Sequence, residues 1–224
     1  MTKAMSKIGV LGTGMVGQAI ASRLVGRGYE VCMGSRSAEN EKALAFSEKY
    51  GDLAENGTFA DAAIFADEIV FNCTNGHASI TALELAGADN LKGKIIIDVA
   101  NPLDFTHGMP PKLLFCNDSS LGEQIQQHFP ESRVVKSLNT MNCEIMLHPE
   151  GIPGDHNVFV CGNDSDARMK VSALLQEFGW KADNITDLGD ITAARGTEML
   201  LPLWLRLFSK IGTVEFNFNI VRKP

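Results

Sequence analysis

The sequence predicts an α/β fold in which a doubly wound, mainly parallel sheet carries a small C-terminal extension of helix and strand. Short apolar runs alternate with amphipathic helical segments through most of the chain, and this alternation is typical of βαβ units. A glycine-rich turn joins the first apolar run to the first helical segment. The chain then ends in one long amphipathic segment and an apolar tail, which form the predicted extension.

The first βα unit is the clearest part of this pattern. Residues 8–11 are apolar and predict a buried strand. A helix is expected over residues 15–25, because Val16, Ile20 and Leu24 recur every four residues and share one face. By the same criteria we expect strands at 29–33, 68–73, 94–99, 133–138, 157–161 and 213–221, and helices at 38–50, from 58, from 120 to 130, at 164–178 and at 191–209.

Three of these helices begin with a capping signal. Thr58 and Ser120 are each followed three residues later by an acidic side chain, which is the capping-box pattern. Asp164 stands where it can accept hydrogen bonds from the first turn of the next helix.

Composition excludes several classes of function. The chain has 224 residues, 45% of them hydrophobic, and a formal net charge of −7, which counts against nucleic acid or an anionic membrane as the main partner. No apolar stretch approaches the ~20 residues of a spanning helix, and residues 1–7 lack the apolar core of a signal peptide. We therefore expect a cytoplasmic protein. The five cysteines are odd in number and widely spaced, so we expect reduced thiols and no metal site.

The strongest motif is the turn after the first strand. It reads Gly12-Thr13-Gly14-Met15-Val16-Gly17, a G-x-G-x-x-G between a strand and a helix. In that context Gly12 permits the tight turn, Gly14 lets a pyrophosphate approach the backbone, and Gly17 lets helix pack on strand. The free N–H groups of the helix N-terminus favour the phosphates. We therefore expect a dinucleotide to bind here.

The end of the second strand decides which dinucleotide is expected. NAD sites usually place an acidic residue there to bind the ribose 2′-hydroxyl, whereas this chain has Ser35 and Arg36. A hydroxyl and a guanidinium would bind a 2′-phosphate that a carboxylate would repel. The sequence thus predicts NADP as the cofactor.

Three more loops follow predicted strands and would lie at the same edge of the sheet. They contain Thr74 and Asn75, Asn101 and Pro102, and Asn139. Their small and amide side chains suit a nicotinamide ring and its ribose.

Candidates for acid–base catalysis are few. His77 and Asn139 are the weak candidates, and Lys136, expected on a strand, lacks the i, i+4 spacing to an Asn that hydroxyacid dehydrogenases use. A hydride passed between two stacked rings needs alignment and exclusion of water more than it needs an acid or base. The sequence therefore favours that kind of reaction.

These motifs together resemble the coenzyme F420-dependent NADP oxidoreductases, the reduced deazaflavin:NADP reductases. The resemblance rests on the glycine turn and on six further segments, which are 34–37, 98–103, 134–140, 160–164, 187–190 and 194–198. It implies a Rossmann-type fold, with NADP on the loop from Thr13 to Val16 and its 2′-phosphate at Ser35 and Arg36. It also implies a nicotinamide near Thr74, Asn75 and Asn139, and a deazaflavin stacked over it above 101–103. The family carries a Lys where this chain has Asn40.

We expect residues 1–224 to form a single NADP-binding domain, with a dinucleotide core of about residues 1–140 and an extension of about 141–224. The predicted activity is hydride transfer between NADP(H) and a flavin-like or deazaflavin acceptor. The fold also looks like the cytosolic domain of six-transmembrane ferric reductases, which leaves an ordinary flavin open. A small imine or ketone reductase similar to pyrroline-5-carboxylate reductase, and a non-enzymatic NADP-binding redox sensor, are the alternatives. The apolar stripe of residues 200–208 suggests a homodimer and is equally explained as core.

Overall fold

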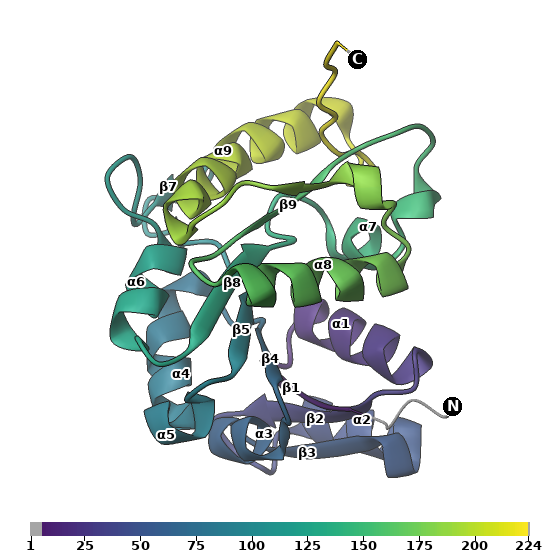
Figure 1. The fold of residues 1–224 in the computed structure, drawn as a ribbon, viewed down its shortest axis with the longest axis vertical. Coiled ribbons are helices and arrows are strands. Elements are labelled where there is room, and N and C mark those ends of the chain that lie inside the picture. Colours follow the sequence, from purple (N-terminus) through teal and green to yellow (C-terminus); the bar gives the residue numbers. More distant parts are fainter. Residues whose placement is uncertain (1–5, 224) are drawn as a thin grey trace.

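Eight strands form one twisted sheet with helices on both faces in the computed structural model of the chain, which describes residues 6–223 (Figure 1). The strands of the sheet are β1 (Lys7–Leu11), β2 (Glu30–Ser35), β3 (Ala54–Thr58), β4 (Ile69–Asn72), β5 (Ile95–Asp98), β8 (Arg133–Ser137), β9 (Val158–Cys161) and β10 (Ile185–Asp187). The helices are α1 (Met15–Gly26), α2 (Glu41–Tyr50), α3 (Phe59–Phe65), α4 (Ser79–Ala86), α5 (Ala88–Leu91), α6 (Leu121–His128), α7 (Cys143–Leu147), α8 (Ser165–Phe178) and α9 (Ala194–Ile211).

The strand order confirms the predicted doubly wound sheet. Across the sheet the strands run β3-β2-β1-β4-β5-β8-β9-β10, and every neighbouring pair is parallel except β8 with β9. The first six strands have the order of two mononucleotide-binding halves. The last two extend the same sheet at its β8 edge, so the C-terminal part of the chain has no separate sheet of its own among the described residues.

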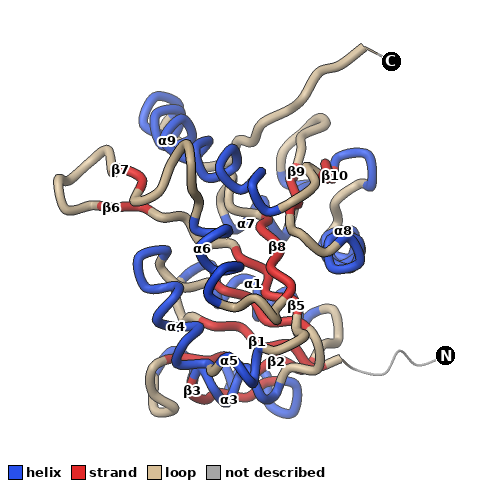
Figure 2. Tube along the Cα trace, turned by 60° about the vertical axis from the view of Figure 1, so that its left-hand side comes forward, coloured by secondary structure: helices blue, strands red, loops and turns tan. Residues whose placement is uncertain are grey.

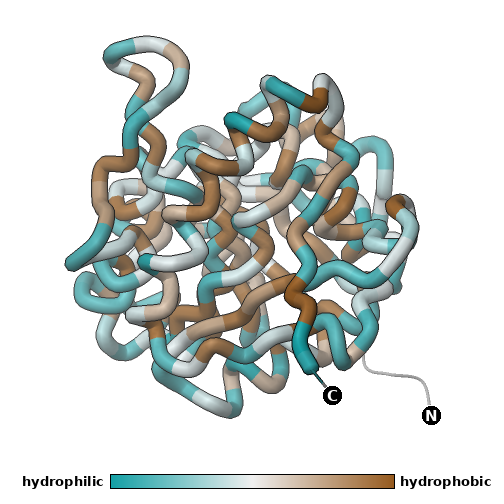
Figure 3. The backbone as a smooth tube through the Cα atoms, turned by 90° about the horizontal axis from the view of Figure 1, so that it is seen from above, coloured by the Kyte–Doolittle hydropathy of each residue, from teal (hydrophilic) through white to brown (hydrophobic). Residues whose placement is uncertain are grey.

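Two apolar cores lie on the two faces of the sheet. Successive strand residues point to opposite faces, so that Ile95 and Ile97 of β5 join one core and Ile96 joins the other. Helices α1, α2, α7 and α8 cover the first face, and α3 to α6 with the start of α9 cover the second. Hydrophobic segments accordingly gather inside the molecule, with hydrophilic ones along the outer turns (Figure 3).

The predicted capping signals act as expected. Thr58 and Asp61 form a reciprocal capping box at the start of α3, the Ser120 side chain accepts a hydrogen bond from Glu123 N at the start of α6, and Asp164 accepts one from Ala167 N at the start of α8. Each cap satisfies a backbone N–H that the helix itself leaves without a partner.

Some expected elements differ from the structure. The helix expected from residue 38 begins at Glu41, because Asn40 is its N-cap and accepts hydrogen bonds from Lys42 N and Ala43 N. The expected strand at 213–221 is wrong: this tail forms no ladder with a described strand and instead bonds to Asn157, just before β9, whose N–H donates to Phe218 O and whose Oδ1 accepts from Ile220 N. β9 already pairs with β8 on one side and β10 on the other, so the tail cannot pair with β9 as a further strand. The structure also contains elements that were not expected: β3, β10, the short helices α4, α5 and α7, and the small hairpin of β6 (Leu103–Asp104) and β7 (Lys112–Leu113).

The carboxyl ends of β1, β2, β4, β5 and β8 meet at one edge of the sheet, because these strands are parallel. The β6–β7 hairpin projects beyond this edge, and α9 crosses near the same end (Figure 2). This edge is therefore where loops from distant parts of the sequence meet.

No helix among residues 6–223 is long and apolar enough to cross a membrane, and this part of the chain holds no cluster of three or more metal-ligating side chains. Residues 1–5, on which the expected lack of a signal peptide partly rests, lie outside the described residues. The homodimer and the cytoplasmic location stay predictions.

All five cysteines are free thiols, and they differ in exposure. Cys116 is exposed, Cys32, Cys143 and Cys161 are buried, and Cys73 is half-buried. Burial raises the pKa of Cys32 and of Cys161 to about 12, and it also raises the pKa of Cys73 and Cys143. Because the thiolate is the reactive form, these four thiols are expected to be inert in the folded protein.

Titration with a disulfide reagent at pH 8 is therefore expected to modify one thiol rapidly in the native protein and all five after denaturation. The Cys116→Ser variant should lose the fast phase and keep the other four thiols protected. Rapid reaction of a second thiol in the native protein would show that one of the other four thiols is readily accessible.

Candidate functional site

The glycine turn between β1 and α1 can be built only with glycine at two of its positions. Gly12 has φ = +118°, and a Cβ atom there would lie 2.7 Å from the carbonyl oxygen of Cys73. A Cβ atom on Gly17 would lie 2.0 Å from the carbonyl oxygen of Gly12, so α1 packs directly on the turn. These are the roles that the motif predicts for its first and third glycines.

Gly14 has a different environment. It is the N-cap of α1 with an ordinary φ of −74°, and no side chain caps the helix there. A Cβ atom added to Gly14 would meet no atom within 4 Å. The N–H groups of the first turn thus face open space, which is the arrangement that favours a bound phosphate.

A cavity of about 920 Å³ opens in front of this turn. It runs from the glycine turn to the end of β2 on one side, and to the loop after β4 and the exposed side of α4 on the other. Its lining includes eight of the residues singled out from the sequence: Gly12, Thr13, Gly14, Ser35, Arg36, Thr74, Asn75 and His77. The size suits an extended nucleotide ligand.

The end of β2 supplies the polar part of this cavity. Arg36 is exposed and makes no hydrogen bond or ion pair with any of the residues 6–223, so its five donors are available to a ligand. The hydroxyl of Ser35 is buried and binds the backbone of Ser37 instead, donating to Ser37 O at 2.5 Å and accepting from Ser37 N at 3.1 Å. Asn40 also lines the cavity, where it caps α2 rather than offering a cation.

The loop after β4 holds its side chains in local hydrogen bonds. The Thr74 hydroxyl donates to Asn72 Oδ1 at 2.6 Å, and the Asn75 side chain accepts from His77 N at 3.0 Å. The His77 side chain is exposed, and it makes no hydrogen bond with the rest of the described chain. Nothing in the structure orients the imidazole for proton transfer.

The other predicted residues lie outside this cavity. Met15 is 75% exposed beside the turn, and Val16 and Gly17 pack within α1. Asn101 and Asn139 bind each other: Asn101 Nδ2 donates to Asn139 O at 2.8 Å, and Asn139 Nδ2 donates to Asn101 Oδ1 at 2.9 Å. Pro102 follows Asn101 in the same loop. Gly76 packs closely against this loop, since a Cβ atom on Gly76 would lie 2.0 Å from Asn101 O. The loops after β4, β5 and β8 are therefore in mutual contact.

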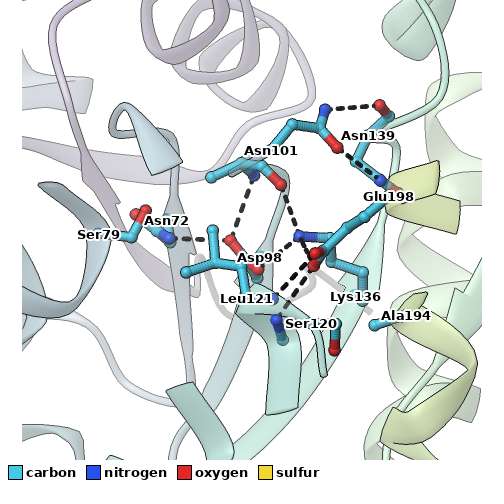
Figure 4. A network of polar contacts seen from close by, with 12 residues as sticks. Asn72, Ser79, Asp98, Asn101, Ser120, Leu121, Lys136, Asn139, Ala194 and Glu198 are labelled. Atoms are coloured by element: carbon cyan, nitrogen blue, oxygen red, sulfur yellow. Dashed lines mark hydrogen bonds and ion pairs between the residues drawn. The ribbon is translucent and has the colours of Figure 1, made fainter. Parts of the chain in front are cut away.

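Sequence reasoning missed two parts of this region. The wall of the cavity on α4, with Thr81, Ala82 and Leu85, carries no motif and could not be recognised. The role of Lys136 was also missed: its ammonium is fully buried, 2.8 Å from Asp98 Oδ2 and 2.8 Å from Glu198 Oε1 (Figure 4). The available signal was the presence of charged residues at the ends of apolar strands, since Asp98 follows three isoleucines and Lys136 follows two valines.

The strand order and the glycine turn define a protein of the Rossmann-type, dinucleotide-binding class. A family model described as "NADP oxidoreductase coenzyme F420-dependent" matches residues 7–102. An F420-dependent NADP reductase of Methanocaldococcus jannaschii is 31% identical over 212 residues, which are 90% of this chain and 92% of the relative. The chain therefore belongs to the family of F420-dependent NADP reductases, which are NADP-dependent oxidoreductases.

Other relatives agree with this assignment to different extents. A crystal structure of an Arthrobacter sp. FB24 protein, assigned to the F420-dependent NADP reductases, is 50% identical, with a TM-score of 0.91 over 97% of this chain and 100% of the other. Metalloreductase STEAP3 of Rattus norvegicus is 30% identical over 90% of this chain, but the chain spans only 38% of that protein. A reductive aminase of Aspergillus terreus, solved with NADPH4, shares the fold with a TM-score of 0.64 and 18% identity, over 92% of this chain and 63% of the other.

The different surroundings of Gly14 and Gly17 give opposite expectations for two alanine variants. Gly14→Ala should fold normally, since its methyl group meets open space, but should weaken NADPH binding by about tenfold or more, because the methyl occupies the approach to the α1 N-terminus. Gly17→Ala forces the backbone apart at a cost of about 1–3 kcal/mol, which lowers the melting temperature by roughly 2–10 °C.

Thermal unfolding and fluorescence titration with NADPH measure the two effects. The Gly14→Ala variant serves as the control for folding of the Gly17→Ala variant. Unchanged NADPH affinity in Gly14→Ala would show that the pyrophosphate does not approach the turn at this residue.

Proposed function

We propose that NADP lies along the cavity with its pyrophosphate at the α1 N-terminus, against Gly12, Thr13 and Gly14. The open space at Gly14 and the uncapped first turn support this placement. Met15 and Val16 supply backbone N–H groups of that turn, and Gly17 keeps the helix close to the strand.

The 2′-phosphate is placed at Ser35 and Arg36 in this proposal. The main support for this placement is the guanidinium of Arg36, because it lines the cavity and has no partner among the described residues. Ser35 acts mainly by shaping the turn, since its hydroxyl already binds the backbone of Ser37. Asn40, which stands where the family carries a Lys, adds no charge here and instead caps α2.

The nicotinamide half belongs at the other end, near Thr74 and Asn75, with Asn101, Pro102 and Asn139 behind it. When bound, the nicotinamide supplies the carbon that gives or takes the hydride. The mutual contacts of the loops hold this end of the site in one shape. We propose that the partner in hydride transfer is the deazaflavin ring of coenzyme F420, which the names of the Methanocaldococcus and Arthrobacter relatives support.

The arrangement favours ring-to-ring hydride transfer over reduction of a carbonyl or imine. The side chains of Thr74, Asn101 and Asn139 are engaged with other residues of the protein. His77, the imidazole of this loop, is not held toward a substrate by any described residue. Such a site aligns two rings and supplies no proton donor in a fixed position.

Arg36→Ala is expected to weaken NADPH binding by about 10- to 100-fold, because hydrogen bonds to a charged group contribute about 1.5–3 kcal/mol. NADH binding should be unchanged, because NADH has no 2′-phosphate. Arg27→Ala, at the exposed C-terminal end of α1, is the matched control and should bind NADPH normally. Equal loss of NADPH and NADH affinity in Arg36→Ala would contradict the assignment.

The acceptor is tested by stopped-flow oxidation of NADPH against F420, FMN and a cyclic imine. We expect rapid oxidation with F420 and at least about tenfold slower oxidation with the other two, because site geometry discriminates by differential stabilisation of the transition state. Preferential reduction of FMN would favour a flavin acceptor, and reduction of the imine alone would favour the imine reductase. Tight NADPH binding without turnover of any acceptor would favour a redox sensor.

A further inference from the structure

A fully buried cluster of three charged side chains lies beneath the strand-end loops (Figure 4). Lys136 of β8 donates to Asp98 of β5 at 2.8 Å, to Glu198 of α9 at 2.8 Å and to the carbonyl oxygen of Ala100 at 2.5 Å. These contacts use all three N–H donors of the ammonium. The side chains of Lys136 and Asp98 are 0% exposed and that of Glu198 is 1% exposed.

The cluster reaches the loop after β4 through one buried amide. Asn72 Nδ2 donates to Asp98 Oδ1 at 2.8 Å, and Asn72 Oδ1 accepts from the Thr74 hydroxyl at 2.6 Å. The Thr74 hydroxyl is therefore two hydrogen bonds away from the carboxylate that binds Lys136.

The charged cluster contacts the loop after β5 directly and, through that loop, the loop after β8. The carbonyl oxygen of Ala100 accepts a hydrogen bond from Lys136, and the N–H of Ala100 donates to Asp98 Oδ1 at 3.2 Å. The next residue, Asn101, binds Asn139 in both directions and carries the backbone on which Gly76 packs. The loop after β8 contains Leu138, a buried non-glycine residue at φ = +65°, so this loop is held in a conformation that it would otherwise avoid.

The charged cluster also contacts the C-terminal extension. Glu198 accepts from Leu121 N at 2.9 Å and from Gly122 N at 3.1 Å, at the N-terminus of α6. The first turn of α6 and the ammonium of Lys136 thus share one carboxylate of α9.

Stability alone is a weak explanation for this cluster. A buried ion group gains little over apolar side chains of the same volume, because each charge loses its hydration. Burial lowers the pKa of Lys136, but the carboxylates of Asp98 and Glu198 outweigh that effect and raise it, so the ammonium remains charged. What the cluster provides, and apolar packing does not, is a set of directed bonds that fix three loops relative to one another.

We propose that Lys136 is a positioning residue, which holds the loops after β4, β5 and β8 in the arrangement that aligns the nicotinamide half for hydride transfer. It does so without touching cofactor or substrate, since its ammonium is enclosed by Asp98, Glu198 and Ala100. The inference rests on the proposed function, because that function places the nicotinamide at these loops. The glycine turn and Arg36 lie outside the cluster, so the adenosine half should not depend on Lys136.

The test uses Lys136→Met, which keeps an unbranched side chain one atom shorter than Lys and removes the ammonium. The double variant Lys136→Met with Glu198→Gln leaves the formal charge of the cluster at −1, as in the original chain. It replaces the single variant in all measurements if Lys136→Met fails to fold. Phe178→Leu is the control for general destabilisation, because Phe178, the last residue of α8, is buried in the apolar core and belongs neither to the cluster nor to the three loops.

Three measurements separate positioning from a purely structural role. Amide hydrogen exchange in the absence of ligand is expected to rise about tenfold or more at residues 73–78 and 99–103 and to stay unchanged at 12–16 and 31–36. Adenosine 2′,5′-bisphosphate contacts only the adenosine half of the site, so its Kd should change less than about twofold. The Kd of NADPH should rise about tenfold. The single-turnover rate of hydride transfer should fall at least about tenfold.

Unchanged exchange at residues 73–78 and 99–103 together with an unchanged ratio of NADPH to bisphosphate affinity would overturn the proposal. Equal losses of both affinities, or the same exchange pattern in Phe178→Leu, would also overturn it, because both indicate a general loss of structure. If the original chain reduces no acceptor, the proposed function fails, and the exchange and affinity measurements still decide the role of Lys136.

Discussion

The buried ammonium of Lys136 is the contact on which the functional edge of this protein depends. Five parallel strands bring their carboxyl ends to that edge, but parallel pairing alone does not fix how the loops beyond it pack. Lys136 joins β8 to Asp98 at the end of β5, to the next loop and to Glu198 of the C-terminal helix. The two apolar cores hold the layers together, and this polar cluster sets the arrangement of the loops above them.

Local sequence signals predicted most of the fold. Apolar periodicity located β1, α1 and the later βα units, and the capping residues Thr58, Ser120 and Asp164 marked helix starts, because these signals depend on near neighbours in the chain. β3 and β10 escaped recognition because they are short and half-polar. The tail at 213–221 has a strand-like composition, but whether it forms a ladder depends on which strand lies beside it in the fold, and a single sequence does not reveal that.

The parts of the candidate site that could be predicted are those in which a short motif determines the local backbone shape. The glycine turn and Arg36 could be recognised because each role follows from one residue type at one position. The pairing of Asn101 with Asn139 and the burial of Lys136 join residues 38 positions apart, and Glu198 comes from a distant helix. No local pattern encodes such contacts, so sequence reasoning could select the residues and could not assign their partners. The resemblance to a family supplied the combination of motifs, and the structure supplies its physical basis.

The continuation of the sheet from β8 into β9 and β10 has a consequence for motion. Many two-domain dehydrogenases open and close a cleft by bending a hinge between two separate bodies. Here the nucleotide strands and the C-terminal strands share one hydrogen-bonded sheet, so the region described has no interdomain joint about which to rotate. If a second ring binds as proposed, closing over it would come from short segments such as the β6–β7 hairpin, above a sheet that both parts of the chain share.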